Sequence, residues 1–343
     1  MTAQRSTMRC EPPHTRADAQ AGPRRRAPRN RTLDLDAGDA ARLRARLVRA
    51  GDVPRLVAAM GAAPLDAVVH GDCREVLPAL PHAFADLLIL DPPYSSGRRF
   101  AGRRFARLSD AAYAEWLGAV LDAALPALKP TASVYLCGDW RSGAAIQAAC
   151  RTRLKLRNRI TWEREKGRGA ARNWKSCAED IWFATVSDRY AFDLDAVKLR
   201  RRVIAPYRGA DGAPKGWADG ADGRFRDTHP SNLWTDLTVP FWSMPENTDH
   251  PTQKPEKLFA KLVLASCATG GVVLDPFLGS GTAAVVALKL GRRFLGIELD
   301  EGFALIALKR LERALGDPAI QGFDDGVFWE RNARPLTRRD PAR

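Results

Sequence analysis

The chain of 343 residues is long enough for one large α/β domain with an insertion, or for two domains, and its 45% hydrophobic content is ordinary for a globular protein that buries a core. Its 54 Lys and Arg against 40 Asp and Glu give a net charge of +14, which favours a polyanionic partner, and nucleic acid fits better than a membrane surface. An Arg-rich composition inherited from a GC-rich genome explains the same excess, so charge alone does not decide.

The six cysteines lack the CxxC spacing of a zinc site and do not resemble a disulfide framework. Free thiols suit a reducing cytoplasm. No apolar run approaches the length of a membrane span, and the amino terminus lacks the apolar stretch of a secretion signal. These features predict a cytoplasmic protein without a metal centre and without a membrane partner.

The amino-terminal region precedes any regular alternation of strands and helices. Residues 1–31 are rich in Arg, Pro, Ala and Thr without periodicity, which predicts a disordered basic arm. Residues 32–65 form a helical extension, broken near Gly51 and Pro54, that we interpret as a packing helix pair rather than as a recognition helix.

From residue 66 the chain alternates between apolar runs and amphipathic stretches. Alternating strands and helices predict an α/β fold, with a parallel sheet covered by helices on both faces. The predicted strands are 67–70, 85–90, 133–137, 156–162, 181–186, 271–274 and 294–298, and the predicted helices are 74–80, 110–128, 143–151, 255–267, 282–290 and 303–315.

The alternation is interrupted once, by residues 196–248, where Gly, Pro, Arg and aromatic residues show little periodicity. This segment is too long for a plain loop, so we interpret it as an insertion with a binding task. It divides the main domain into residues 66–195 and 249–318, and residues 319–343 form a poorly patterned carboxyl-terminal tail.

A glycine-rich loop, Asp275–Thr282, follows the predicted strand at 271–274. Gly279 and Gly281 allow backbone angles and close ligand contact that a Cβ would forbid. The sequence is neither GxGxxG nor GxxxxGK[ST], which argues against a dinucleotide and against a P-loop. Because Asp275 can pair with a cationic amine, the loop favours the methionine end of S-adenosylmethionine over a pyrophosphate.

Glu298 ends the next strand, where an acid can accept both ribose hydroxyls of a nucleoside cofactor. The alternative interpretation is a solvated acid at a strand end. The glycine-rich turn is a weak signal alone, but the turn, Asp275 and Glu298 together favour a ligand site.

The tetrapeptide Asp91-Pro92-Pro93-Tyr94 follows the strand at 85–90 and forms a rigid projection, because each proline fixes φ and restricts the residue before it. The Asp91 carboxylate and the Pro92 carbonyl can both accept hydrogen bonds from one exocyclic amine. This would favour a pyramidal nitrogen whose lone pair points at a methyl sulfonium. Tyr94 offers a face on which the base can stack, and access requires the base to leave the duplex. The alternative for this turn is a stiff strand end without chemistry.

These motifs resemble the amino-methyltransferases that modify DNA. The catalytic turn precedes the cofactor loop, with a long irregular segment between them, and this permuted order resembles the β class. The family fold implies seven strands in the order 3-2-1-4-5-7-6, which here correspond to 67–70, 294–298, 271–274, 85–90, 133–137, 181–186 and 156–162. The strand at 181–186 should be the antiparallel one.

The resemblance also implies the binding site of S-adenosylmethionine. The segment His250–Pro255 is similar to the motif that covers the methionine carboxylate in this class, with Thr252 and Lys254 as the matching polar groups. Asp72 resembles the family residue that meets the adenine amine, although it could instead cap a helix. The cofactor residues implied are Asp72, Cys73, Asp91, His250, Thr252, Gln253, Lys254, Pro255, Asp275, Pro276, Phe277, Gly279, Ser280, Gly281, Thr282, Glu298, Leu299 and Asp300.

Three basic regions are candidates for contact with double-stranded DNA: the loop 97–107 after the catalytic turn, the stretch 163–175 and the insertion 196–248, which is the candidate target-recognition region. Their cations could read base edges or hold phosphates, and the sequence does not separate these roles. The DNA-binding residues predicted are Arg98, Arg99, Arg103, Arg104, Arg168, Arg172, Arg201, Arg224 and Arg226.

The function predicted is site-specific methylation of the N6 amine of adenine in duplex DNA, because Asp is more often the first residue of the catalytic turn in N6-adenine enzymes and Ser in N4-cytosine enzymes. Ser95 and Ser96 follow Tyr94 where many adenine enzymes carry Asn, so N4-cytosine methylation stays the alternative. More remote alternatives are methylation of RNA or of a protein glutamine, and a noncatalytic DNA-binding protein. The resemblance to restriction–modification enzymes also implies a bacterial or phage origin and two further partners, a second copy of the chain and a cognate restriction endonuclease.

Overall fold

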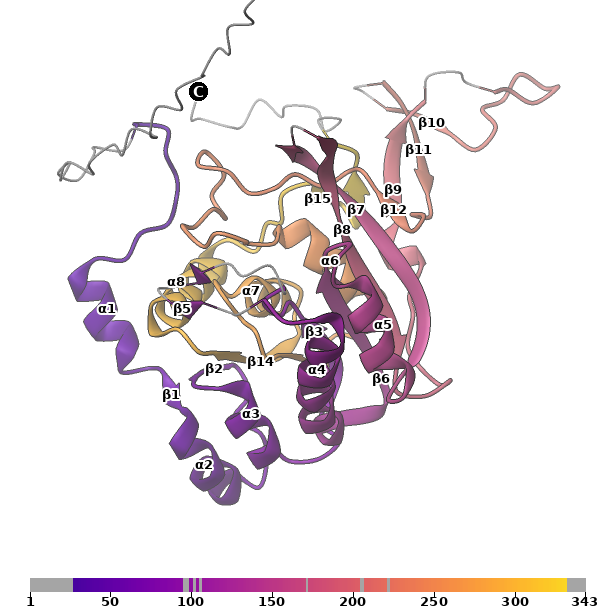
Figure 1. Cartoon of the computed structure of the whole chain (residues 1–343). Helices are drawn as coiled ribbons and strands as arrows, with labels where there is room; N and C mark the ends of the chain where they lie inside the picture. Colours follow the sequence, from indigo (N-terminus) through magenta and orange to yellow (C-terminus); the bar gives the residue numbers. More distant parts are fainter. Residues whose placement is uncertain are drawn as a thin grey trace, which may run out of the picture.

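The computed structural model describes residues 27–94, 99–100, 103–104, 107–170, 172–203, 207–220 and 223–331, with the backbone alone at 99–100, 103–104, 165–170 and 219–220. A central sheet runs through the middle of the molecule, and a second, smaller sheet lies beside it (Figure 1). No helix among the described residues is long and apolar enough to cross a membrane.

The central sheet confirms the predicted strand order and extends it at both edges. Every neighbouring pair is parallel except those of β8, which runs antiparallel to β6 and to β7. The two-residue edge strands β1 and β12 were not predicted, because two residues carry no periodicity. In spatial order the strands are β1 (Val48–Arg49), β2 (Ala67–His70), β14 (Arg293–Glu298), β13 (Val272–Asp275), β3 (Ala85–Leu90), β6 (Leu128–Gly138), β8 (Asn173–Thr185), β7 (Lys155–Ala170) and β12 (Leu233–Trp234).

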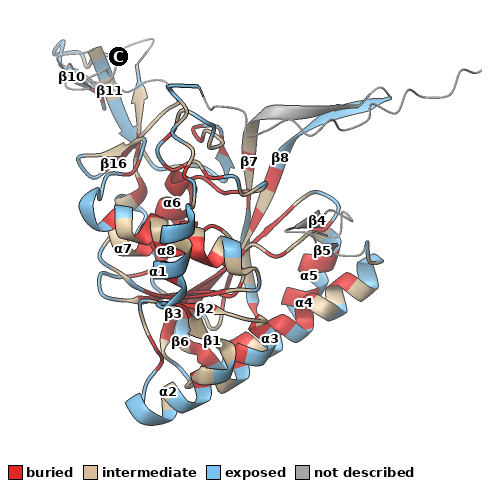
Figure 2. Ribbon diagram, turned by 90° about the vertical axis from the view of Figure 1, so that its left-hand side faces the viewer, coloured by how far each residue is buried: buried red, intermediate tan, exposed pale blue. Residues whose placement is uncertain are grey.

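Helices cover both faces of this sheet, as predicted (Figure 2). Along β3, Leu87 and Ile89 belong to one hydrophobic cluster and Leu88 and Leu90 to the other, as expected for a strand buried on both faces. The helices of the first face are α6 (Glu256–Ser266), α7 (Thr282–Lys289) and α8 (Glu301–Gly316), and those of the second are α3 (Cys73–Val76), α4 (Asp110–Ala124) and α5 (Gly143–Arg151).

Local signals in the sequence account for several helix ends. Ser109 caps α4, where its Oγ accepts a hydrogen bond of 3.2 Å from the Ala112 N–H. The predicted stop near residue 129 is too late, because α4 ends at Ala124 and a 3-10 turn containing Pro126 leads into β6. Proline lacks the N–H that a continuing helix needs.

The amino-terminal extension packs against the main domain (Figure 1). Its helices are α1 (Ala37–Arg44) and α2 (Val53–Met60), and Leu43 of α1 is fully buried. Arg42 forms an ion pair with Glu312 of α8. The predicted break near Gly51 and Pro54 is confirmed, because residues 45–52 separate the two helices and Pro54 lies in the first turn of α2, where its missing N–H costs nothing.

The insertion is more regular than its sequence suggests. Residues 196–248 contain β9 (Leu199–Arg202), β10 (Ala218–Gly220) and β11 (Gly223–Thr228) in addition to β12. They form a second sheet of order β10-β11-β9-β16-β15, in which the last two strands come from the carboxyl-terminal region. Polar strands on a small, half-exposed sheet lack the apolar alternation that sequence analysis relies on.

The predicted boundary at residue 319 does not divide the structure. Strands β15 (Phe323–Asp324) and β16 (Val327–Trp329) complete the sheet of the insertion, and β16 pairs in parallel with β9. Phe328 is fully buried there. The described part of the tail, residues 320–331, therefore belongs structurally with the insertion.

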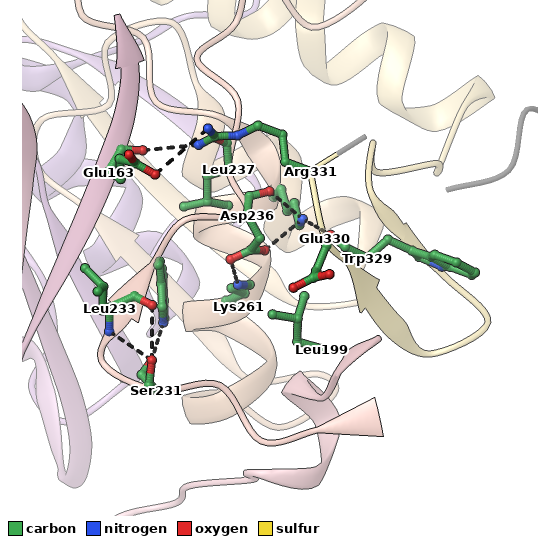
Figure 3. Close-up of polar contacts among 12 residues, drawn as sticks. Glu163, Leu199, Ser231, Leu233, Asp236, Leu237, Lys261, Trp329, Glu330 and Arg331 are labelled. Atoms are coloured by element: carbon green, nitrogen blue, oxygen red, sulfur yellow. Dashed lines mark hydrogen bonds and ion pairs between the residues drawn. The ribbon is translucent and has the colours of Figure 1, made fainter. Parts of the chain in front are cut away.

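A buried ionic cluster holds this carboxyl-terminal segment in place (Figure 3). Lys257 and Lys261 of α6 lie 2.8 and 2.7 Å from the two carboxylate oxygens of Asp236, and the side chains of all three residues are at most 8% exposed. Lys257 also donates to the Trp329 carbonyl, and Arg331 donates to the Leu237 carbonyl. We call Asp236, Lys257 and Lys261 the interior cluster.

Strands β7 and β8 form a long hairpin that projects from the body of the molecule, and β10 and β11 reach the same upper end in both views (Figures 1 and 2). The two hairpin strands extend well beyond the predicted limits of 156–162 and 181–186. The basic stretch predicted at 163–175 lies in the distal part of this hairpin.

Candidate active site

A cavity of about 380 Å³ lies at the carboxyl ends of β3, β13 and β14. All four residues of the catalytic turn line it, together with all the predicted cofactor residues except Pro255 and Gly281. Tyr94 and Gly279, far apart in the sequence, therefore share one cavity. This follows from the parallel pairing of β3 with β13, because the carboxyl ends of parallel strands meet at one edge of a sheet.

The two exceptions have structural explanations. Pro255 is the residue before α6 and caps its amino end. Gly281 has a φ of 87°, and a Cβ there would come within 2.7 Å of the Ala307 Cβ, so this glycine permits α7 to approach α8. Gly279 has a φ of 54°, and its Cβ would lie 3.0 Å from His250 Nε2 in the cavity wall.

The Asp91 carboxylate is held from two sides. Lys254 Nζ lies 2.8 and 2.7 Å from its two oxygens, and the Tyr94 hydroxyl donates to Oδ1 over 3.1 Å. Burial raises the pKa of Asp91, and the ammonium of Lys254 opposes this shift. Asp91 keeps 17% of its side chain exposed.

Lys254 lines the cavity and is part of an ion pair with the catalytic turn. Its side chain is 4% exposed, its Nζ pairs with Asp91, and the same Nζ lies 3.4 Å from Glu179 Oε2. Burial disfavours its charge, but the two carboxylates outweigh burial and raise the pKa of Lys254. Lys254 is therefore a charged part of the catalytic end of the cavity.

The cavity is also lined by two acids that have no basic partner among the described residues. Asp275 is 3% exposed, its Oδ1 accepts the Phe277 N–H over 3.0 Å, and burial raises its pKa well above the usual range. Glu298 accepts the N–H groups of Gly279 and Asp300 over 2.7 and 2.8 Å, and burial raises its pKa as well. Neither acid has a basic partner among the described residues.

This surplus of buried acid fits a cationic ligand. A positive charge close to Asp275 would stabilise the ionised carboxylate that burial disfavours. His250 adds no charge, because burial lowers its pKa to about 4, and its Nδ1 has no hydrogen-bond partner among the described residues. S-adenosylmethionine carries a sulfonium and an ammonium group, so the residues present fit it.

Several predicted cofactor residues use their polar atoms inside the protein. The Gln253 amide accepts from Thr248 and donates to the Glu246 carbonyl, and the Thr282 hydroxyl donates to the Lys254 carbonyl over 3.2 Å. Asp72 caps α3 by accepting the Arg74 N–H over 2.9 Å, as its alternative interpretation predicted. These side chains shape the cavity wall and also fix the loops that form it.

Sequence analysis missed part of the site. Aromatic side chains surround the predicted residues: Trp116 packs against Phe277 with ring centroids 5.9 Å apart, and Phe303 against His250 at 4.4 Å. No spacing in the sequence marks Trp116 or Phe303. The missed lining residues are Gly71, Arg74, Trp116, Phe259, Leu278 and Phe303.

Glu179 was also missed, although the predicted topology contained the signal. Because β8 runs antiparallel, the two acids before the predicted strand 181–186, Glu179 and Asp180, lie at the edge of the sheet where the parallel strands end, and Glu179 contacts the catalytic turn. There it accepts from the Tyr94 hydroxyl over 3.3 Å and from Arg164 over 2.5 Å.

The described DNA-binding residues that were predicted lie on the β4–β5 hairpin, on the β7–β8 hairpin and on strands β9 and β11, and none of them is among the residues that line the cavity. Arg224 and Arg226 of β11 and Arg172 of the β7–β8 hairpin are exposed, while Arg201 of β9 is half-buried with its Nε 3.7 Å from Glu330. Backbone alone is described for Arg168 and, in β4 (Arg99–Phe100) and β5 (Arg103–Arg104), for Arg99, Arg103 and Arg104. Arg98, Ser95 and Ser96 lie outside the described residues.

Comparison with known proteins places the chain among enzymes of this kind. A family model described as DNA methylase matches residues 85–309. The chain is 32% identical over 254 residues to the DNA adenine methyltransferase YhdJ of Escherichia coli (strain K12), covering 72% of this chain and 83% of that protein. It is 30% identical over 242 residues to the type II methyltransferase M.HpaI of Haemophilus parainfluenzae, covering 70% of each. The solved PvuII DNA methyltransferase (cytosine-N4-specific) has a TM-score of 0.52 at 17% identity, covering 73% of this chain and 90% of that one.

The mostly parallel sheet, with a cavity at the carboxyl ends of its strands, defines the S-adenosylmethionine-dependent methyltransferase fold. The chain belongs to the DNA methylase family of N6-adenine and N4-cytosine amino-methyltransferases, of the restriction–modification type. S-adenosylmethionine is the cofactor of this family, and double-stranded DNA is the substrate that membership implies.

Proposed function

We propose that this protein transfers a methyl group from S-adenosylmethionine to the N6 amine of adenine, at a specific sequence in duplex DNA. The observation that carries the proposal is that Asp91 and Tyr94 line one cavity together with Asp275 and Glu298, two buried acids without a basic partner among the described residues. The E. coli relative is named as a DNA adenine methyltransferase, which supports adenine as the base.

In this mechanism the residues of the catalytic turn bind and orient the amine. S-adenosylmethionine, when bound, supplies an electrophilic methyl group. The Asp91 carboxylate and the Pro92 carbonyl accept the two amine hydrogens, which directs the nitrogen lone pair toward the methyl carbon. Preorganised acceptors of this kind act mainly through position and charge. Tyr94, whose hydroxyl is held by Asp91, provides the ring on which the base stacks.

The target adenine must leave the helix to reach Asp91, so we propose base flipping. We assign recognition of the target to the sheet of the insertion, extended by β15 and β16 because these strands complete it. The predicted arginines of the β4–β5 and β7–β8 hairpins and of strands β9 and β11 would hold the DNA backbone or read base edges. Arg224 and Arg226 lie on this sheet and are exposed.

Expression in cells that lack adenine and cytosine methylation, followed by modification-sensitive sequencing, tests the base and the motif together. We expect N6-methyladenine at one sequence motif, and none when Asp91→Asn replaces the wild type. N4-methylcytosine in the motif would contradict the assignment of the base but keep the enzyme class. Unmodified DNA together with undetectable binding of S-adenosylmethionine would instead favour a noncatalytic DNA-binding protein.

Base flipping has its own test once the motif is known. A duplex with 2-aminopurine at the target position should become more fluorescent when the protein binds, because the base loses its stacking neighbours. The same fluorophore at a position outside the motif is the control. An unchanged signal at the target position, with binding verified, would argue against flipping.

A further inference from the structure

Glu179 of β8 connects three groups at the catalytic end of the cavity. Its Oε2 accepts the Tyr94 hydroxyl over 3.3 Å and lies 3.4 Å from Lys254 Nζ, while its Oε1 receives Arg164 at 2.5 Å. The side chain is only 11% exposed. A buried carboxylate with this many partners is held in one orientation.

Asp91 and Glu179 share the same two neighbours. The Tyr94 hydroxyl lies 3.1 Å from Asp91 Oδ1 and 3.3 Å from Glu179 Oε2, so the two carboxylates share its one proton, and the Lys254 ammonium lies within 3.4 Å of both. One ammonium therefore serves two acids. Arg164, at 2.5 Å from Glu179 Oε1, supplies the second positive charge that a buried pair of carboxylates requires.

We propose that Glu179 is a positioning residue for methyl transfer, which fixes Tyr94 and Lys254 around Asp91 and shares the ammonium of Lys254 with it. The inference rests on the proposed function, in which Asp91 accepts a hydrogen of the target amine. By attracting Lys254, Glu179 leaves Asp91 incompletely neutralised and so a stronger acceptor. By accepting the Tyr94 hydroxyl, Glu179 also fixes the ring on which the base stacks.

The charges around Asp91 predict the direction in which its pKa shifts when a neighbour is replaced. The negative charge of Glu179 raises the pKa of Asp91, whereas Lys254 lowers it. Removing the charge of Glu179 should therefore lower the pKa of Asp91, whereas removing the charge of Lys254 should raise it. The other titratable groups that influence or respond to Asp91 are Asp275 of β13, Tyr113 of α4 and Cys137 of β6.

The experiment compares the pH dependence of kcat in three variants under saturating DNA and S-adenosylmethionine. Glu179→Gln removes the charge, Glu179→Asp keeps the charge but shortens the side chain, and Asp180→Asn is the matched control. Asp180 is the next residue in the strand, and its carboxylate accepts from Thr161 over 2.8 Å instead of contacting the cavity residues.

For Glu179→Gln we expect kcat to fall about tenfold to a hundredfold, with KM for both substrates within about twofold of the wild type. The acidic limb of its kcat profile should shift to lower pH, because the like charge that raised the pKa of Asp91 is gone. Glu179→Asp should keep the acidic limb close to that of the wild type and recover part of kcat. Asp180→Asn should match the wild type in both.

Lys254→Gln provides the opposing measurement, since its acidic limb should shift to higher pH. The proposal is overturned if Glu179→Gln matches Asp180→Asn in kcat and in pH profile, or if Glu179→Gln and Lys254→Gln shift the limb in the same direction. If Glu179→Gln does not fold, Glu179→Asp decides, because a wild-type kcat in that variant would also overturn the positioning role. The proposed function fails differently, through a wild-type protein that methylates no DNA.

Discussion

Two buried lysine–carboxylate clusters involve helix α6 and the residues just before it, and they differ in charge and in surroundings. Lys254 meets Asp91 and Glu179 beside the cavity, so one ammonium faces two acids. The interior cluster reverses the ratio, because Lys257 and Lys261 meet the single acid Asp236 (Figure 3).

The surroundings explain the two ratios. Around the interior cluster, other groups of the protein stabilise the surplus positive charge. Lys257 donates to the carbonyl oxygens of Asp236 and Trp329, and Lys261 lies 4.7 Å from the ring centroid of Trp234. At the cavity, Arg164 balances Glu179, and the negative surplus comes from Asp275 and Glu298, which line the same open space without a basic partner among the described residues. A buried ion pair thus indicates a binding site when its uncompensated charge faces a cavity, and a structural lock when the protein fills every side.

The largest effect expected is a loss of activity when the acid beside the cavity is replaced. Asp91→Asn removes the charged acceptor of the amine, and we expect kcat to fall about a thousandfold, as for other preorganised groups of an active site. Its folding should be little affected, because Lys254 keeps Glu179 as a partner. Methyl incorporation into duplex DNA and urea unfolding measure the two properties. A variant with near wild-type kcat would remove Asp91 from the mechanism.

Replacing the acid of the interior cluster should lower the stability of the protein. Asp236→Asn leaves two buried ammonium groups without a counter-charge, and we expect a loss of about 3 kcal/mol in the free energy of unfolding, at the lower end for a broken buried pair because backbone carbonyls remain. Asp122→Asn, which breaks an exposed pair with Arg153, is the control and should lose far less. Equal losses in the free energy of unfolding of the two variants would show that the interior cluster does not stabilise the fold more than an exposed ion pair does.

Binding of S-adenosylmethionine should depend on pH through the buried acids that line the cavity. Burial raises the pKa values of Asp275 and Glu298, so a cationic ligand favours the deprotonated form of both acids. Affinity should therefore fall as the pH is lowered through the range in which these acids take up protons, by at most about tenfold per pH unit for each proton displaced. Calorimetry in two buffers of different ionisation enthalpy measures the protons released. Affinity independent of pH would contradict a surplus of buried acid.

The smallest effect concerns Lys261, whose pKa burial lowers to about 8 despite Asp236. An unfolded lysine keeps its proton up to a pH of about 10.4, so between these values the unfolded state binds more protons and stability rises with pH. Lys261→Met should abolish that rise while changing the free energy of unfolding at neutral pH by no more than about 1.5 kcal/mol. Urea unfolding from pH 7 to 10 measures both, and a rise that persists in the variant would assign it to another group.

The central sheet and most of the cavity could be predicted from the sequence. Buried parallel strands are continuous apolar runs, and the residues that follow them, such as Asp91 and Asp275, meet at one edge whatever the loops between them do. The small sheet could not be predicted, because strands such as β9 and β11 are rich in arginine and lack an apolar alternation.

The sequence by itself determined the strands and the residues that line the cavity from the catalytic turn and the cofactor loop, and its resemblance to a known family implied the strand order and the class of enzyme. Only the tertiary structure decided that Lys254 pairs with Asp91, that Glu179 joins them from an antiparallel strand, and that residues 320–331 complete the insertion. The reason is physical: periodicity and turn chemistry act over a few neighbouring residues, whereas the partner of a buried charge is set by which distant segments the fold brings within a few ångströms.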